Sequence, residues 1–535
     1  MGVSAAAAPP FGAAELAPPD VDLLVQVRGL DEVWPRLERT AIGRLLAERI
    51  AKSELGRSWE RFAEAHGEEP RSLAFSLLGK DAVWMAREAG DDGEQWVLLS
   101  RVEAETKGDR LAAWRARPLG GGQYLVAAEG LVLAEAPPWL LVASAARRGL
   151  FDEVLQRAEA AGATPAHASL QDRLEPPAHF VDERACISAY LDRAPWVTQP
   201  TLATVAVGER GIAVELDPAR PEPPPGPPAE PLSFDRSFAQ LAGSLQRDHL
   251  AVVLSAGGVD LPLGGEWLAA LPEAAVTPAL GSVAGPRRIW VLGETCGGRR
   301  DPDRSLKTPA VAFAVEVHEE ERATNRLEHW AESVAVAVNR RFADSIESPV
   351  TASPTPWGGR VDLEPLMRSL SGGHPLARRA RLVWTVAADP DRHWAVVASE
   401  PAWLRSIAGT IESHAGGPGE GSLADRLIEA SQQAMDAATR DPLDLPVQQG
   451  WVRGDAVAEH LRGWCRNADR FASPERCEEF KVRWNSLAEW ADSLGEVQWT
   501  VVRSPSGTLR TSIQLQSPSS AVDRGVSALG GSGSD

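Results

Sequence analysis

The sequence lacks several features that would assign it to a class at once. No uninterrupted apolar run approaches about 18 residues, so no segment resembles a membrane-spanning helix. Basic residues are in deficit, because 55 Lys+Arg stand against 74 Asp+Glu among 535 residues, a formal net charge of −19. Such an acidic surface repels phosphate backbones and anionic lipid, which disfavours a role on nucleic acid or on a membrane surface. With four cysteines the chain is not a disulfide-dense scaffold either.

Signatures of catalysis and of cofactor binding are missing as well. Gly79-Lys80 lacks the upstream glycine of a phosphate-binding P-loop, and Gly120–Gly122 precedes a strand rather than following one. No nucleophile elbow of the form G-x-S-x-G occurs, and the ten histidines and four cysteines form no H-x-H, H-E-x-x-H or C-x-x-C pair. The sequence therefore predicts no cofactor.

Composition divides the chain into five segments. An Ala/Pro-rich tail (1–20), expected to be disordered, has neither the basic nor the apolar region of a signal peptide, although it resembles the stretch that follows one. The stretch 218–232 is so proline-dense that it should run as an extended linker. It separates a first α+β repeat (21–217) from a second (233–516). A flexible C-terminal tail (517–535) follows.

Two six-residue matches indicate that the halves repeat each other. Trp139–Ser144 (WLLVAS) matches Trp394–Ser399 (WAVVAS). Thirty residues after Trp139 begins SLQDRL, and twenty-eight residues after Trp394 begins SLADRL. The same order and nearly equal spacing argue against chance and favour an internal repeat.

Both halves also end in an antiparallel hairpin signal. TLATVAV and IAVEL flank a glycine-containing turn in the first half, as VQWTVV and TLRTSIQL do in the second. Phe180–Leu191 is expected to correspond to Trp451–Leu461, a strand end followed by a helix that would carry Cys186. The second half has a helical insertion at about 463–492. We predict an α+β fold of two pseudo-repeated halves, each a mainly antiparallel sheet with helices packed on one face.

This pattern resembles an uncharacterised bacterial family of exported proteins, a domain of unknown function. The likeness is carried by VDLLVQVRGLDEVWPRLERTAIGRLL (21–46), by WLLVAS with the helix after it, and by SLQDRL before the next strand and helix. It spans most of the chain and includes no catalytic signature. The resemblance implies an internally duplicated α+β fold and a periplasmic or secreted location, and it implies no activity. A cytoplasmic location is the alternative, because the sequence shows no signal peptide.

Carboxylates on a second-half loop are the weak candidates for catalysis. Asp389, Asp391 and His393 occupy a turn between two strands and would supply the acid and base of a hydrolase. The same residues also fit a plain hairpin turn, since their counterpart in the first half is the turn at Ala136–Pro138. The structural interpretation is the preferred one.

Weak candidates for a divalent cation lie upstream. Asp301 and Asp303 belong to a glycine-rich loop, and His318 precedes three glutamates where a strand turns into a helix. Acidic residues at a helix N-terminus are favoured by the helix dipole without any metal, and the loop has a plain turn as its counterpart. We therefore predict no metal site.

The cysteines of the helical insertion allow two interpretations. Cys465 and Cys477 stand on either side of a turn containing Pro474. In an oxidising compartment they would form a local disulfide worth about 2–3 kcal/mol, and in the cytosol they would be free thiols.

The resulting hypothesis is a non-catalytic, extracytoplasmic binding or scaffolding protein with a protein or small-molecule partner. The alternative is a carboxylate-based hydrolase with its site in the groove between the two halves. A third interpretation is an assembly subunit that uses exposed tryptophans as interface anchors, with Trp403, Trp464 and Trp490 as candidates.

Overall fold

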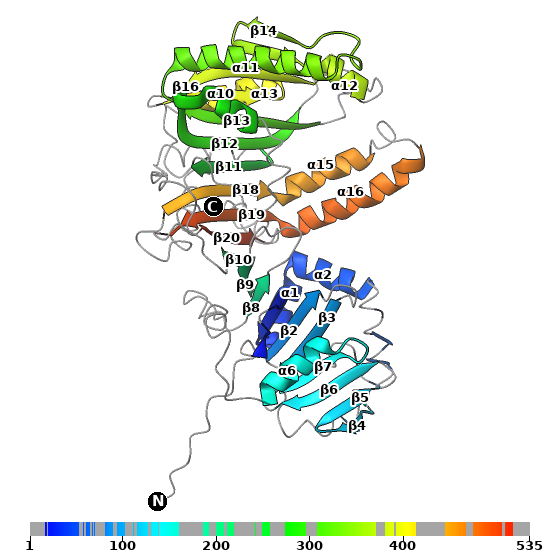
Figure 1. Cartoon of the computed structure of the whole chain (residues 1–535). Helices are drawn as coiled ribbons and strands as arrows, with labels where there is room; N and C mark the ends of the chain where they lie inside the picture. Colours follow the sequence, from blue (N-terminus) through cyan, green and yellow to red (C-terminus); the bar gives the residue numbers. More distant parts are fainter. Residues whose placement is uncertain are drawn as a thin grey trace, which may run out of the picture. The chain divides into compact units, whose positions relative to one another are not determined.

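The computed structural model describes residues 16–18, 20–52, 57, 60–61, 63–64, 67, 69, 81–88, 94–101, 111, 115–126, 130–136, 139–159, 186–191, 200–207, 211–218, 241, 245, 249–256, 273–295, 308–370, 380–389, 392–413, 445–466, 474–504 and 509–516. The chain divides into two compact units, Met1–Glu222 and Pro223–Asp535, whose boundary falls in the proline-rich stretch. Both units mix helices with an antiparallel sheet, which confirms the α+β class (Figure 1). No helix among the described residues is long and apolar enough to cross a membrane.

The first unit contains ten described strands. They are β1 (Leu23–Arg28), β2 (Asp81–Glu88), β3 (Glu94–Arg101), β4 (Arg117–Gly120), β5 (Gln123–Val126), β6 (Leu131–Ala136), β7 (Trp139–Ser144), β8 (Cys186–Leu191), β9 (Thr201–Val207) and β10 (Gly211–Pro218). All neighbours are antiparallel, in the order β4-β5-β6-β7-β3-β2-β1-β8-β9-β10. The helices are α1 (Leu30–Arg39), α2 (Ala41–Lys52) and α6 (Gly149–Glu159).

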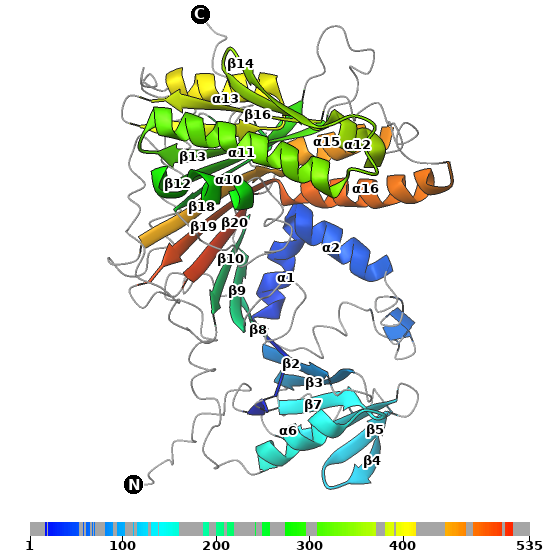
Figure 2. The same ribbon diagram turned by 45° about the horizontal axis from the view of Figure 1, so that its top comes forward.

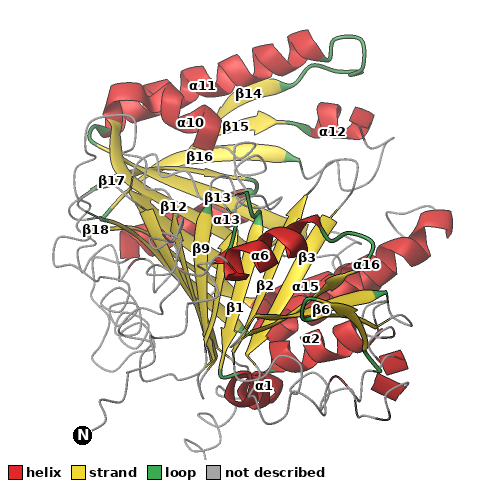
Figure 3. Ribbon diagram, turned by 60° about the horizontal axis from the view of Figure 1, so that its bottom comes forward, coloured by secondary structure: helices red, strands yellow, loops and turns green. Residues whose placement is uncertain are grey.

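Strand β7 is buried on both faces of this sheet. Phe151 and Val154 of α6 pack with Leu141 on one face, and Figure 3 shows α6 lying across the strands. The alternate residues Leu140 and Val142 belong to a separate cluster on the other face. Because successive side chains of a strand point to opposite faces, burial on both faces requires an unbroken apolar run, which is what WLLVAS provides.

The second unit also contains ten described strands. They are β11 (Ala251–Ala256), β12 (Ala284–Thr295), β13 (Thr308–Val317), β14 (Thr351–Thr355), β15 (Gly358–Asp362), β16 (Arg381–Ala388), β17 (His393–Ala398), β18 (Leu445–Arg453), β19 (Glu496–Arg503) and β20 (Leu509–Gln516). Their order is β14-β15-β16-β17-β13-β12-β11-β18-β19-β20, again antiparallel throughout. The helices are α10 (Glu273–Leu280), the 3-10 turn η4 (Gly281–Val283), α11 (Glu320–Arg341), α12 (Glu364–Leu370), α13 (Pro401–Ser413), α15 (Gly454–Arg466) and α16 (Pro474–Leu494).

Helices cover both faces of the second sheet, so the expectation of helices on one face is wrong there. Ile407 of α13 packs on the face that carries Ala312 and Ala314. Leu327 of α11 packs on the opposite face, which carries Phe313. β13 therefore has a core on each side, and its TPAVAFAVEV sequence is apolar at consecutive positions for the same reason as β7.

The region around Cys186 is a strand and not a helix. β8 begins at Cys186 and pairs with both β1 and β9, so the helix expected for this segment is corrected. Val25 of β1 pairs with Ala189, and Val253 of β11 pairs with Gly450 in the corresponding place. In the strand order of the second sheet, β18, which precedes α15, occupies the place that β8 has in the first.

Two lines of paired residues show how closely the registers of the two sheets agree. In the first unit the line is Pro118, Tyr124, Leu133, Val142, Leu98, Trp84, Val25, Ala189, Ala203 and Leu216. In the second unit it is Pro354, Gly359, Trp384, Val397, Phe313, Trp290, Val253, Gly450, Trp499 and Ile513. Each line crosses all ten strands in the same order, and each starts at a proline on an outer strand.

Candidate functional site

The catalytic candidate Asp389 closes the hairpin between β16 and β17. Its Oδ2 accepts a hydrogen bond of 2.9 Å from Nε1 of the buried Trp394, and its backbone N–H donates to the carbonyl of Arg392 at 2.9 Å. Both bonds hold the turn and seat the indole in the core. Asp391 lies outside the described residues.

The two histidine candidates lie at the same end of the second sheet, His393 at the start of β17 and His318 directly after β13. His393 pairs with Val317 across β17 and β13, and its Nδ1 lies 3.7 Å from Oε2 of Glu320 at the start of α11. His318 is exposed and donates its backbone N–H to Val283 at 3.0 Å. Asp301 and Asp303 fall outside the described residues. Among the residues that the structure does describe, no group of three His, Cys, Asp or Glu side chains could hold a metal ion.

A buried charged triad next to these residues escaped the sequence analysis. Oε1 of Glu316, on β13, lies 2.9 Å from Nη1 of Arg287 on β12 and 3.5 Å from Nε of Arg392 before β17. The three side chains are 10%, 13% and 14% exposed. A Cβ at Gly285 would lie 2.9 Å from Cγ of Glu316, so the carboxylate rests against bare backbone. The triad ties three strand ends together, which is a structural role.

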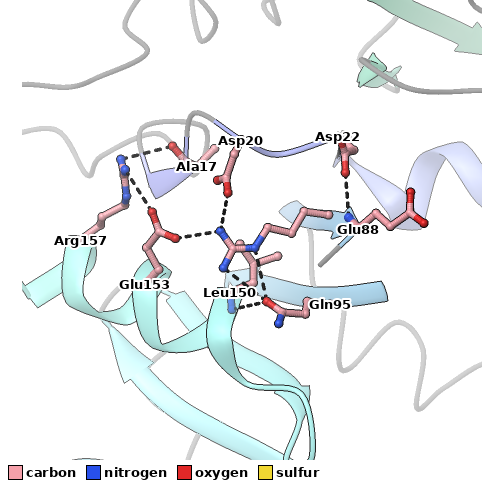
Figure 4. Close-up of polar contacts among 9 residues, drawn as sticks. Ala17, Asp20, Asp22, Glu88, Gln95, Leu150, Glu153 and Arg157 are labelled. Atoms are coloured by element: carbon pink, nitrogen blue, oxygen red, sulfur yellow. Dashed lines mark hydrogen bonds and ion pairs between the residues drawn. The ribbon is translucent and has the colours of Figure 1, made fainter. Parts of the chain in front are cut away.

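The first unit has a polar network of its own, around Arg87 of β2 (Figure 4). Nη1 of Arg87 contacts Oδ2 of Asp20 at 2.8 Å and Oε2 of Glu153 on α6 at 2.9 Å. Its Nε and Nη2 donate to Oε1 of Gln95 at 3.3 Å, and the same oxygen accepts the N–H of Leu150 at 2.9 Å.

This network fastens the segment before β1 to the core. Arg157 of α6 donates to the carbonyl of Ala17 at 3.4 Å, and the N–H of Glu88 donates to Asp22 at 2.7 Å (Figure 4). Ala17 and Val21 are buried in the same apolar cluster as α6. The network is therefore a clamp on the segment that carries Ala17, Asp20 and Asp22.

We expect Arg87→Met to lower the free energy of unfolding by about 2 kcal/mol, because it removes charge-assisted bonds from a side chain that is 16% exposed. Limited proteolysis should then cut near Asp20 sooner than in the wild type. Lys52→Met is the matched control, since the side chains of Lys52 and its partner Glu48 are 72% and 59% exposed and the pair should contribute little. Equal losses in both variants would contradict the clamp.

Helices α15 and α16 form an arm inserted between β18 and β19, and they lie side by side in Figures 1 and 2. The sequence places this helical pair at about 463–492, whereas the arm begins at Gly454 and ends at Leu494. In the first unit, β8 ends at Leu191 and β9 begins at Thr201, so the same connection is short.

Two glycines, Gly454 and Gly495, join the start of α15 to the end of α16 at the base of the arm. The N–H of Gly454 donates to the carbonyl of Gly495 at 2.6 Å. A Cβ at Gly454 would lie 2.1 Å from the carbonyl oxygen of Ala491 and 2.4 Å from that of Gly495. Arg462 also pairs with Asp492 at 2.7 Å. Only glycine allows α15 to begin this close to the end of α16.

One side of the arm carries a partly exposed apolar surface, which we call the aromatic face. It consists of Val457, Leu461, Trp464, Phe480, Trp484 and Leu487. The rings of Trp464 and Trp484 stack with centroids 5.8 Å apart, and those of Phe480 and Trp484 are 5.3 Å apart. Leu487 is 45% exposed. The interface candidate Trp464 thus lies in this face. Trp403, on α13, is instead buried in the core between α13 and the second sheet.

The arm's two cysteines are free, buried thiols in this structure, so the candidate disulfide between Cys465 and Cys477 is not formed. Sγ of Cys465 lies 3.7 Å from the carbonyl oxygen of Lys481, one helical turn beyond Cys477. Burial raises the pKa of the Cys465 thiol above its ordinary value. Both cysteines act as small packing residues between the helices.

Sequence reasoning found the insertion but not the surface it displays. The signal was present, because Val457, Leu461 and Trp464 follow an i, i+4, i+7 spacing, as do Phe480, Trp484 and Leu487. Such a stripe is ordinarily buried, and its partial exposure is visible only in three dimensions. No known protein family, curated protein or solved structure matches the chain, so the function has to be argued from these residues.

Proposed function

We propose that the protein is a non-catalytic binding or scaffolding protein and that the arm is its recognition element. The observation that carries the proposal is the aromatic face, where five apolar side chains of intermediate burial adjoin the exposed Leu487 on an insertion between β18 and β19. Contiguous exposed apolar surface on a folded protein marks an interaction site more often than chance exposure does. Insertions into a repeated framework are also the usual place for binding surfaces.

We further propose that the two units are duplicated copies of one fold. Two observations support this: the strand orders coincide when each number in the first unit is raised by ten, and the two lines of paired residues keep the same register. In both lines WLLVAS and WAVVAS stand at the same position, as their sequence match requires. The arm is then a departure from the common plan, present between β18 and β19 alone. An extracytoplasmic location completes the proposal and rests on the sequence resemblance.

The hydrolase alternative receives less support. A catalytic carboxylate has to reach substrate, yet Asp389 bonds the indole of Trp394 and Glu316 is held by two arginines. Both side chains are buried in contacts that hold strand ends together. A binding role accounts for the partly exposed aromatic face, which a hydrolase would not require.

A photo-crosslinking amino acid at position 487 tests the proposal in cells that produce the protein. We expect a discrete covalent adduct from this position, because the aromatic face touches the partner. The matched control is position 336 on α11, where Val336 is 67% exposed on another long helix. Adducts of equal yield at both positions, or none at position 487, would count against the arm as recognition element.

A further inference from the structure

We draw no further inference here: the strongest candidate, the aromatic face on the arm formed by α15 and α16, belongs to the site already described, and nothing in the part of the chain that the structure describes shows what covers it.

Discussion

Replacing Glu316 with glutamine is expected to lower the free energy of unfolding of the second unit by about 3 kcal/mol. The carboxylate lies 2.9 Å from Arg287 and 3.5 Å from Arg392, and all three side chains are at least 86% buried. A glutamine of the same shape keeps one carbonyl oxygen toward the two guanidinium groups but removes the negative charge. Two largely buried arginines then face a neutral amide in place of a carboxylate, and removing one charge of a buried ion pair is costly.

Guanidinium chloride denaturation followed by tryptophan fluorescence measures this loss, because Trp394 is fully buried in the second unit. Glu319→Gln provides the matched control. Glu319 also pairs with an arginine, Arg322 at 2.8 Å, but the two side chains are 52% and 70% exposed. Its removal should change the free energy by about 0.5 kcal/mol or less. Similar small effects in both variants would show that the triad contributes nothing beyond a surface ion pair.

Gly454→Ala is expected to cost about 2–3 kcal/mol and to loosen the arm. The new methyl group would overlap two backbone oxygens, those of Ala491 and Gly495, at 2.1 Å and 2.4 Å. Neither atom belongs to a flexible side chain, so the start of α15 has to move away from the end of α16. Hydrogen exchange should show faster opening of α15 and α16.

Gly409→Ala is the control for the effect of alanine itself. Gly409 lies within α13, and a Cβ built there meets nothing within 4 Å. The substitution should raise the free energy of unfolding by about 0.5–1 kcal/mol, because alanine favours the helix over glycine. A gain at both positions would mean that the arm does not depend on the close approach at its root.

Strand and hairpin positions were predictable because their signals are local. Alternating apolar residues around glycine-containing turns predicted β9–β10 and β19–β20, and the matched WLLVAS and WAVVAS runs are strands β7 and β17. The helix predicted for the segment at Cys186 is wrong. The sequence CISAYL is as compatible with a helix as with a strand until its neighbours β1 and β9 are known. The second covered face of the second sheet was missed for a related reason. An unbroken apolar strand shows that both faces are buried, but not that helices cover both of them.

The contacts of individual charged and aromatic side chains were harder to predict from the sequence than the strands. Asp389 and His393 were noticed because they cluster along the chain, and the structure gives Asp389 a bond to Trp394 instead of a free carboxylate. The buried triad is assembled from residues on β12, β13 and the turn before β17, which are far apart in sequence and carry no motif. The aromatic face combines two stripes whose exposure depends on which side of each helix meets the other.

The prolines that begin the two lines of paired residues have a consequence for aggregation. Pro118 and Pro354 stand on β4 and β14, the outer strands at corresponding ends of the two sheets. Proline has no N–H to offer an incoming strand, and its ring obstructs the approach of another backbone. Each proline therefore weakens its strand as a template for cross-β growth. Helices α15 and α16 pair their backbone groups along each helix and can display apolar side chains without adding a strand edge.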